Sequence, residues 1–130
     1  MTEDWEVRPL GELVDVLDSQ RIPVSATERA TRPGVVPYYG ATGQVGWIDE
    51  ALFDEPLILL GEDGVQFFDP TKSKAYLIDG PTWVNNHAHV LRAREVDRRY
   101  LNHFLNQVDY RAFANGTTRL KLTQAAMRRI

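Results

Sequence analysis

The first apolar positions of the chain repeat with the period of a helix. Leu10, Leu13, Val14 and Leu17 stand at i, i+3, i+4 and i+7, which would place them on one face of a short helix. Residues 19–34 are polar and include two prolines, so this stretch is predicted to be a long loop. Long loops without regular structure are often functional.

Short apolar runs then alternate with turn residues, a pattern typical of strands. Residues 35–39 and 44–48 flank a glycine-rich turn, which predicts a hairpin. Further strands are predicted over residues 57–60, 65–68, 75–78, 82–85 and 87–91. The first of these runs is apolar at every position and therefore predicts a buried strand.

Helices are expected mainly towards the C-terminus. Asp97 can cap a helix whose basic residues, Arg98 and Arg99, lie away from the core. The buried face of that helix is predicted to consist of Tyr100, Leu101, Phe104 and Leu105. A brief strand with a basic polar face is expected at residues 119–122, and Thr123 can cap a second helix that begins at Gln124.

Length and composition favour one packed unit of the α+β class over residues 1–130. The 130 residues suffice for a single hydrophobic core, and 43% hydrophobic with 25% charged residues is an ordinary globular mixture. We therefore expect a strand-rich twisted sheet scaffold with short helices that presents loops. No apolar run approaches the roughly 20 residues of a membrane span, and no secretory signal order is present, so a cytoplasmic protein is expected.

Charge is distributed unevenly along the chain. The formal net charge is -3, which argues against a generally basic nucleic-acid binder. Residues 1–90, however, carry six Lys/Arg against fifteen Asp/Glu, whereas residues 91–130 carry nine against three. The basic C-terminal third could neutralise phosphates, because screening limits distant acidic groups to about 8–10 Å. It could equally be a solvated helix face.

The stretch WVNNHAHVL, residues 83–91, holds the most conspicuous polar residues. On one strand, His87 and His89 share a face and could bind a metal beside Asn85, as a metal-dependent nuclease would require. No spacing supplies a third ligand, and the chain has no cysteine. The alternative is a structural seam, in which Asn85, Asn86, His87 and His89 satisfy backbone groups and carboxylates. We expect no metal site and no catalytic residue.

Five longer stretches occur together in a distinctive order. They are PYYGATGQVGWID (37–49), LFDEPLILLGEDG (52–64), WVNNHAHVL (83–91), YLNHFLNQVDY (100–110) and GTTRLKLT (116–123). In order and spacing they closely resemble the target recognition domain of type I restriction-modification specificity subunits, from about Trp5 to Ile130. The resemblance implies that the chain corresponds to one such domain, without the second recognition domain or most of the spacer helices, and we expect it to end at or near the start of a spacer helix.

The resemblance implies a non-catalytic module that reads one half of a split double-stranded DNA target. Its implied partners are the methyltransferase subunit and, indirectly, the restriction subunit, with no membrane contact. The methyl donor and ATP with Mg²⁺ would belong to those subunits, and no cofactor is expected in this chain. A nuclease that uses His87 and His89, or a module that binds only protein, remains an alternative.

Residues between the shared stretches are the candidates for reading bases, because the shared stretches would build the scaffold. These base-reading candidates are Gln20, Arg21, Gln66, Lys72 and Lys74, and Gln44 at the hairpin is added to them. The candidates for phosphate contacts combine small hydroxyls with cations just before a helix: Thr117, Thr118, Arg119 and Lys121.

Overall fold

Two four-stranded sheets form the centre of the molecule. The computed structural model describes residues 8–115 and 120–130. The strands are β1 (Val14–Val16), β2 (Val36–Tyr39), β3 (Gln44–Ile48), β4 (Phe53–Asp54), β5 (Leu57–Gly61), β6 (Ala75–Ile78), β7 (Pro81–Val84) and β8 (Ala88–Ala93). The first sheet has the order β1-β8-β5-β6 and the second β3-β2-β7-β4. Neighbouring strands are antiparallel except β2 and β7, which are parallel.

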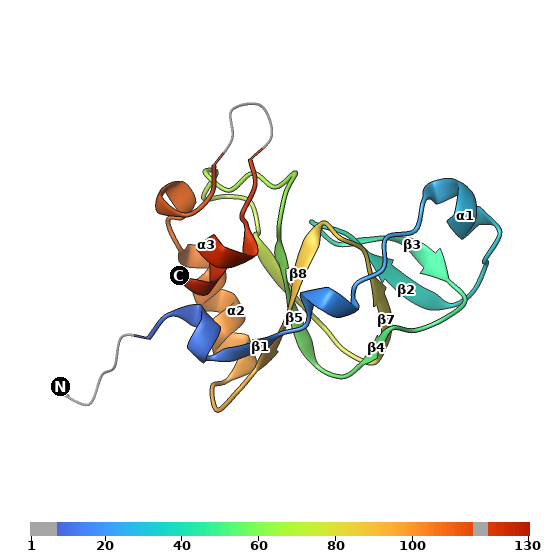
Figure 1. Ribbon diagram of the computed structural model, residues 1–130, viewed down its shortest axis with the longest axis horizontal. Coiled ribbons are helices and arrows are strands. Elements are labelled where there is room, and N and C mark those ends of the chain that lie inside the picture. The colour runs from blue at the N-terminus through green and yellow to red at the C-terminus, as the bar shows by residue number, and fades with distance from the viewer. Residues whose placement is uncertain (1–7, 116–119) are drawn as a thin grey trace.

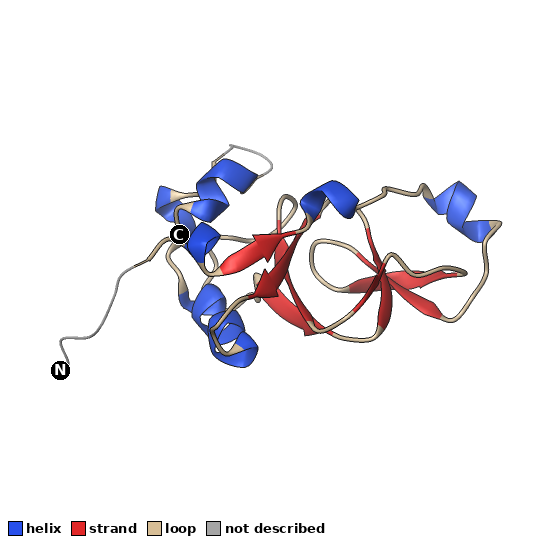
Figure 2. Ribbon diagram, turned by 60° about the horizontal axis from the view of Figure 1, so that its bottom comes forward, coloured by secondary structure: helices blue, strands red, loops and turns tan. Residues whose placement is uncertain are grey.

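The helices are short, and the three α-helices lie at the two ends of the molecule (Figure 1, Figure 2). They are α1 (Ala26–Ala30), α2 (Arg98–Gln107), α3 (Gln124–Arg128) and the 3-10 turns η1 (Leu10–Glu12), η2 (Asp18–Gln20) and η3 (Tyr110–Ala112). In Figure 1, α2 and α3 cover one side of the first sheet, the second sheet lies on the other side, and α1 stands at the far end. Figure 2 shows the same arrangement, with most strands between the helices of the two ends. The class is α+β, as predicted, with two sheets as its scaffold.

β5 is the most deeply buried strand because both of its faces are covered. Ile58 and Leu60 belong to the core shared with the helices, whereas Leu57 and Leu59 belong to the core that also contains residues of the second sheet. All four side chains are 0% exposed. This double burial explains why the run is apolar at every position.

The predicted helix over the first apolar positions is wrong. The chain forms η1, β1 and η2 there, and β1 pairs with β8 in the register Val14↔Ala93. Leu10 and Val14 lie in the helix-side core, whereas Leu17 lies in the core between the sheets. The helical spacing therefore arises from apolar residues that face two different cores, and pairing with β8 overrides it.

The stretch after β1 is more ordered than a loop. Within residues 19–34 the chain forms the end of η2 and the helix α1, which Ser25 caps by accepting a hydrogen bond from the Glu28 amide. Arg29 lies over the ring of Tyr38, 4.6 Å from its centroid, and so fastens α1 to β2.

The expected strand at residues 65–68 is also wrong. Val65 and Phe67 are buried, which produces the alternation of a strand, but the backbone turns: the Phe67 amide donates to the Val65 carbonyl. The brief strand expected before α3 reduces to isolated bridges from Lys121 to Asp63 and Asn115. At residues 65–68 the buried side chains alternate although the backbone forms a turn. Arg119, the first residue of the other expected strand, lies outside the described residues.

The C-terminal helices begin where their caps predict. Asp97 accepts hydrogen bonds from two amides of the first turn of α2, and Thr123 accepts one from Ala126 at the start of α3. The predicted buried face of α2 is half right, since Leu101 and Leu105 are buried, whereas Tyr100 and Phe104 are 60% and 45% exposed.

Arg98, expected to lie away from the core, instead donates to the carbonyls of Leu57 and Ile78. It thereby joins α2 to the ends of β5 and β6. No helix within the described ranges is long and apolar enough to cross a membrane.

Candidate functional site

A buried polar cluster joins three distant parts of the chain at the end of β8. His89, on β8, is fully buried. Its Nδ1 lies 2.7 Å from Asp18 Oδ2, on η2, and its Nε2 lies 2.6 Å from the Leu122 carbonyl oxygen, just before α3. The imidazole ring of His89 therefore connects η2, the first sheet and the segment before α3.

Asp18 is the acidic centre of this cluster. Its Oδ1 accepts a hydrogen bond from the Val90 amide at 2.8 Å, and its Oδ2 also accepts one from Gln124 Nε2 at 3.2 Å. Burial alone would raise the pKa of Asp18, but the hydrogen bond and charge of His89, the Val90 amide and Arg21 together hold that pKa below its ordinary value. The carboxyl group is thus held in its ionised form.

Arg21, one of the predicted base readers, completes the cluster. Its Nη1 donates to Glu62 Oε1 and to the Ala88 carbonyl, each at 2.8 Å, and its Nε donates to the Asp18 carbonyl at 2.9 Å. Only 15% of its side chain is exposed. The structure therefore places this guanidinium among acceptors of the chain itself.

The carboxylates and the imidazole of the cluster are side chains that could bind a metal ion. Each of them, however, already binds another group of the chain. Ligand atoms of Asp18, Glu62 and His89 lie within 4.8 Å of one another. Both ring nitrogens of His89 are engaged, and the Arg21 guanidinium occupies Glu62. Arg21 is therefore the cation that these carboxylates already bind.

The two histidines do not converge on one site. β8 begins at Ala88, so His87 lies in the preceding turn, where its Nδ1 is 2.8 Å from Asp63 Oδ1. Asn85 Oδ1 accepts from the His87 amide at 2.8 Å, and the exposed Asn86 offers its carbonyl to Arg21. The contacts of these four polar residues are those of a structural seam, and the geometry does not favour a nuclease that uses both histidines.

Four of the six base-reading candidates are exposed, whereas Lys74 is buried. Gln20, Gln44, Gln66 and Lys72 are exposed. Lys74 is 3% exposed and its Nζ donates to the Asp69 carbonyl. The structure therefore places its ammonium group against the backbone of the turn.

Of the four phosphate candidates, Lys121 is the one whose position the structure describes. Thr117, Thr118 and Arg119 lie outside the described residues. Lys121 is half exposed, with its Nζ 3.9 Å from Glu62 Oε2. The Leu122 amide donates to the Glu62 carbonyl at 2.6 Å, so this segment is fastened directly to the polar cluster.

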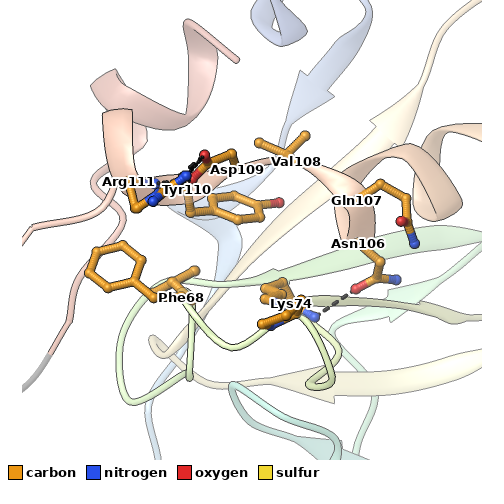
Figure 3. Close-up of a pocket in the computed structure, with 10 residues that line it drawn as sticks. Phe68, Lys74, Asn106, Gln107, Val108, Asp109, Tyr110 and Arg111 are labelled. Carbon is orange, nitrogen blue, oxygen red and sulfur yellow. Dashed lines mark hydrogen bonds and ion pairs between the residues drawn. The ribbon is translucent and has the colours of Figure 1, made fainter.

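A pocket of about 400 Å³ opens between the turn that follows Val65 and the end of α2 with η3. Figure 3 shows Phe68 and Lys74 on one side of it and Asp109 and Arg111 on the other. Asp109 binds Arg111 at 2.6 Å, and the bond lowers the pKa of Asp109 to about 2. Sequence reasoning missed this pocket, because its two walls are distant in the chain.

Comparison with known proteins identifies the class. A family model described as "Type I restriction modification DNA specificity domain" matches residues 2–130. The chain therefore belongs to this family, in agreement with the resemblance of its five shared stretches.

The chain matches one part of a longer curated relative. It is 31% identical over 126 residues to a curated protein of Haemophilus influenzae named as a type I restriction enzyme specificity subunit. The match covers 96% of this chain and 32% of that relative, so the chain spans about a third of the relative's length.

Two solved structures share the fold. The type I restriction-modification S subunit of M. genitalium superposes with a TM-score of 0.73 at 17% identity, over 100% of this chain and 34% of that one. A chain from a structure titled for complex assembly and conformational transition of the type I R-M system gives 0.69 at 12% identity, over 100% and 34%. At these identities the likeness establishes the architecture alone.

Proposed function

We propose that this chain is a DNA sequence-recognition module of a type I restriction-modification system, which reads one half of a split target. The observation that carries the proposal is the match of a DNA specificity domain to residues 2–130, almost the whole chain. The chain spans only about a third of its curated relative, so a complete specificity function would need further segments or subunits.

Base reading is assigned to exposed side chains on turns that the two sheets hold in place. Gln20, Gln44, Gln66 and Lys72 are exposed and lie between or at the ends of rigid elements. A glutamine can form two hydrogen bonds with adenine and a lysine can bind guanine, each pair contributing about 1–3 kcal/mol of discrimination. Arg21 and Lys74 take structural roles in this proposal.

Phosphate contacts are assigned to the segment that precedes α3. Lys121 is exposed and is held at a defined position by the adjacent Leu122. Thr117, Thr118 and Arg119 precede it and supply two hydroxyls and a further cation. Such contacts strengthen binding to every sequence and make it dependent on salt.

Catalysis is assigned to partner subunits. The chain would direct a methyltransferase subunit and, through it, a restriction subunit, and these would hold the methyl donor and ATP with Mg²⁺. The separate engagement of His87 with Asp63 and of His89 with Asp18 supports a non-catalytic role.

Selection of randomised DNA duplexes by the 130-residue chain, repeated at low and high salt, tests the proposal. We expect an enriched half-site and binding that weakens steeply with salt. Gln66→Ala and Lys72→Ala should relax the preference at single positions. Lys121→Ala should weaken binding to all DNA sequences alike. It should also lower the slope of log affinity against log salt concentration by about 1.

Arg99→Ala is the matched control, because Arg99 is an exposed cation on α2 that we assign to no DNA contact. It should leave both preference and salt slope unchanged. Binding that is independent of salt, or a uniform loss from all of these variants, would contradict the proposal. Co-elution with a methyltransferase subunit but not with DNA would favour the protein-binding alternative.

A further inference from the structure

His89 faces an oxygen acceptor on each side of its ring. Nδ1 lies 2.7 Å from a carboxylate oxygen of Asp18, and Nε2 lies 2.6 Å from the carbonyl oxygen of Leu122. A carbonyl oxygen has no hydrogen to donate. Besides His89, Asp18 Oδ1 accepts from the Val90 amide, Oδ2 accepts from Gln124 Nε2, and the Arg21 guanidinium lies 4.0 Å from Oδ2. The carboxyl oxygens therefore face donors and a cation, as an ionised carboxylate requires.

A neutral imidazole cannot satisfy both contacts. It carries one N–H and one unprotonated nitrogen, so one of the two short contacts would bring lone pairs together. The ring is 0% exposed, and no solvent is available to relieve that repulsion. Two N–H donors, the imidazolium form, match both oxygens.

The charges around the ring lead to the same conclusion. Asp18 and Glu62 are the carboxylates of the cluster, with 4% and 16% of their side chains exposed, and Arg21 is its buried cation. With a neutral His89 these groups would bury one uncompensated negative charge, whereas an imidazolium brings their sum to zero. Lys121 approaches Glu62 at 3.9 Å but is 51% exposed, so solvent screens its contribution.

We infer that His89 is a positively charged positioning residue, which clamps the segment before α3 to the first loop. Its two N–H groups bind Asp18 on η2 and the Leu122 carbonyl. The same segment is bound again where the Leu122 amide donates to Glu62 and where Gln124 donates to Asp18. The buried charge of His89 thus fixes the position of Leu122 and, with it, that of the adjacent Lys121.

Nitrogen NMR of the chain labelled at histidine tests the charge directly. At pH 7.5 both ring nitrogens of His89 should give the signals of N–H groups. The exposed His103 on α2 provides the internal reference against which the His89 signals are compared. A neutral pattern for His89 in the folded chain would overturn the inference.

Two variants separate charge from mere packing. In Asp18→Asn the acceptor for Nδ1 loses its charge, and His89 should change to the neutral pattern with one proton directed at Leu122. A histidine that only fills space would keep the spectrum of the wild type. If this variant does not fold, the wild-type spectrum decides alone.

His89→Gln tests the clamp, since glutamine is neutral and can preserve one of the two contacts. Hydrogen exchange at the Leu122 amide should become about 10- to 100-fold faster, as expected for loss of a charge-assisted bond, with α2 unaffected. Unchanged exchange at Leu122 would refute the clamp.

A DNA measurement with the same variant rests on the proposed function. His89→Gln should weaken binding to all duplexes alike and leave the preferred sequence unaltered, and a changed preference would argue against positioning of a phosphate contact. If the wild type binds no duplex, the proposed function fails, while the NMR and exchange results still decide the charge and the clamp.

Discussion

Replacing Asp18 by Asn removes one negative charge from the buried cluster and leaves the size of the side chain unchanged. The side chains of Asp18 and His89 are 4% and 0% exposed, so little solvent can compensate for the lost partner. Removing one member of a buried ion pair typically costs about 3–5 kcal/mol. Since a domain of this kind is stable by about 5–15 kcal/mol, the variant should lose a large part of its stability.

Urea unfolding, followed by tryptophan fluorescence to which the buried Trp83 contributes, measures this loss. Asp15→Asn provides a matched control, because it makes the same chemical change in an exposed pair: Asp15 Oδ2 lies 3.3 Å from Arg92 Nη1, and 37% of the Asp15 side chain is exposed. A pair of this kind contributes about 0–1 kcal/mol. The two variants should therefore differ by at least about 2 kcal/mol.

Acid should abolish the difference between Asp18→Asn and the wild type. The pKa of Asp18 in the folded chain lies below its ordinary value of 3.8, so ionised Asp18 stabilises the fold at any pH above that value. This contribution decreases as the pH falls through the lowered folded pKa. The difference in unfolding free energy should narrow below about pH 4.

Two results would refute this reasoning. One is an Asp18→Asn chain that is as stable as Asp15→Asn at neutral pH. The other is a stability difference that persists unchanged in acid. Either would mean that the cluster does not depend on an ionised Asp18.

Three further substitutions test the packing and capping of the fold. Thr82→Val should raise the free energy of unfolding by about 1 kcal/mol, because the buried Thr82 hydroxyl has no hydrogen-bond partner within the described residues; destabilisation in urea would contradict this. Gly34→Ala should cost about 1–3 kcal/mol, since a Cβ there would lie 2.3 Å from the Ile48 carbonyl oxygen, and an unchanged Tm would be the opposing result. Asp97→Ala should cost about 1 kcal/mol by removing the acceptor for the Tyr100 amide, whereas Asp97→Asn, which keeps an acceptor, should be nearly neutral in thermal unfolding.

Local patterns predicted those elements whose residues interact with near neighbours in the chain. The hairpin at residues 35–48 forms as β2 and β3, because the glycine-rich turn and the two apolar runs are adjacent. The helices α2 and α3 begin after Asp97 and Thr123, because a cap acts within three residues. Long-range pairing, in contrast, replaced the expected first helix by β1.

The candidate site was likewise predictable only as far as neighbouring residues indicate it. Its polar residues were visible in the sequence, and a structural seam was one of the two alternatives open for Asn85, Asn86, His87 and His89. The partners of His89 were not visible, because Asp18 is 71 positions away and Leu122 is 33. Arg21 and Lys74 were expected to be accessible, since a polar turn does not reveal which of its side chains folds inward.

The sequence by itself determined the α+β class, the family and the helix caps, because apolar spacing, shared stretches and caps are properties of neighbouring residues. Only the tertiary structure decided that the strands divide into two sheets, that Arg21 is internal and that His89 lies between two acceptors. These features depend on residues that burial on both faces of β5 and β8 brings together. The pattern of neighbouring residues does not indicate which distant groups will be in contact there.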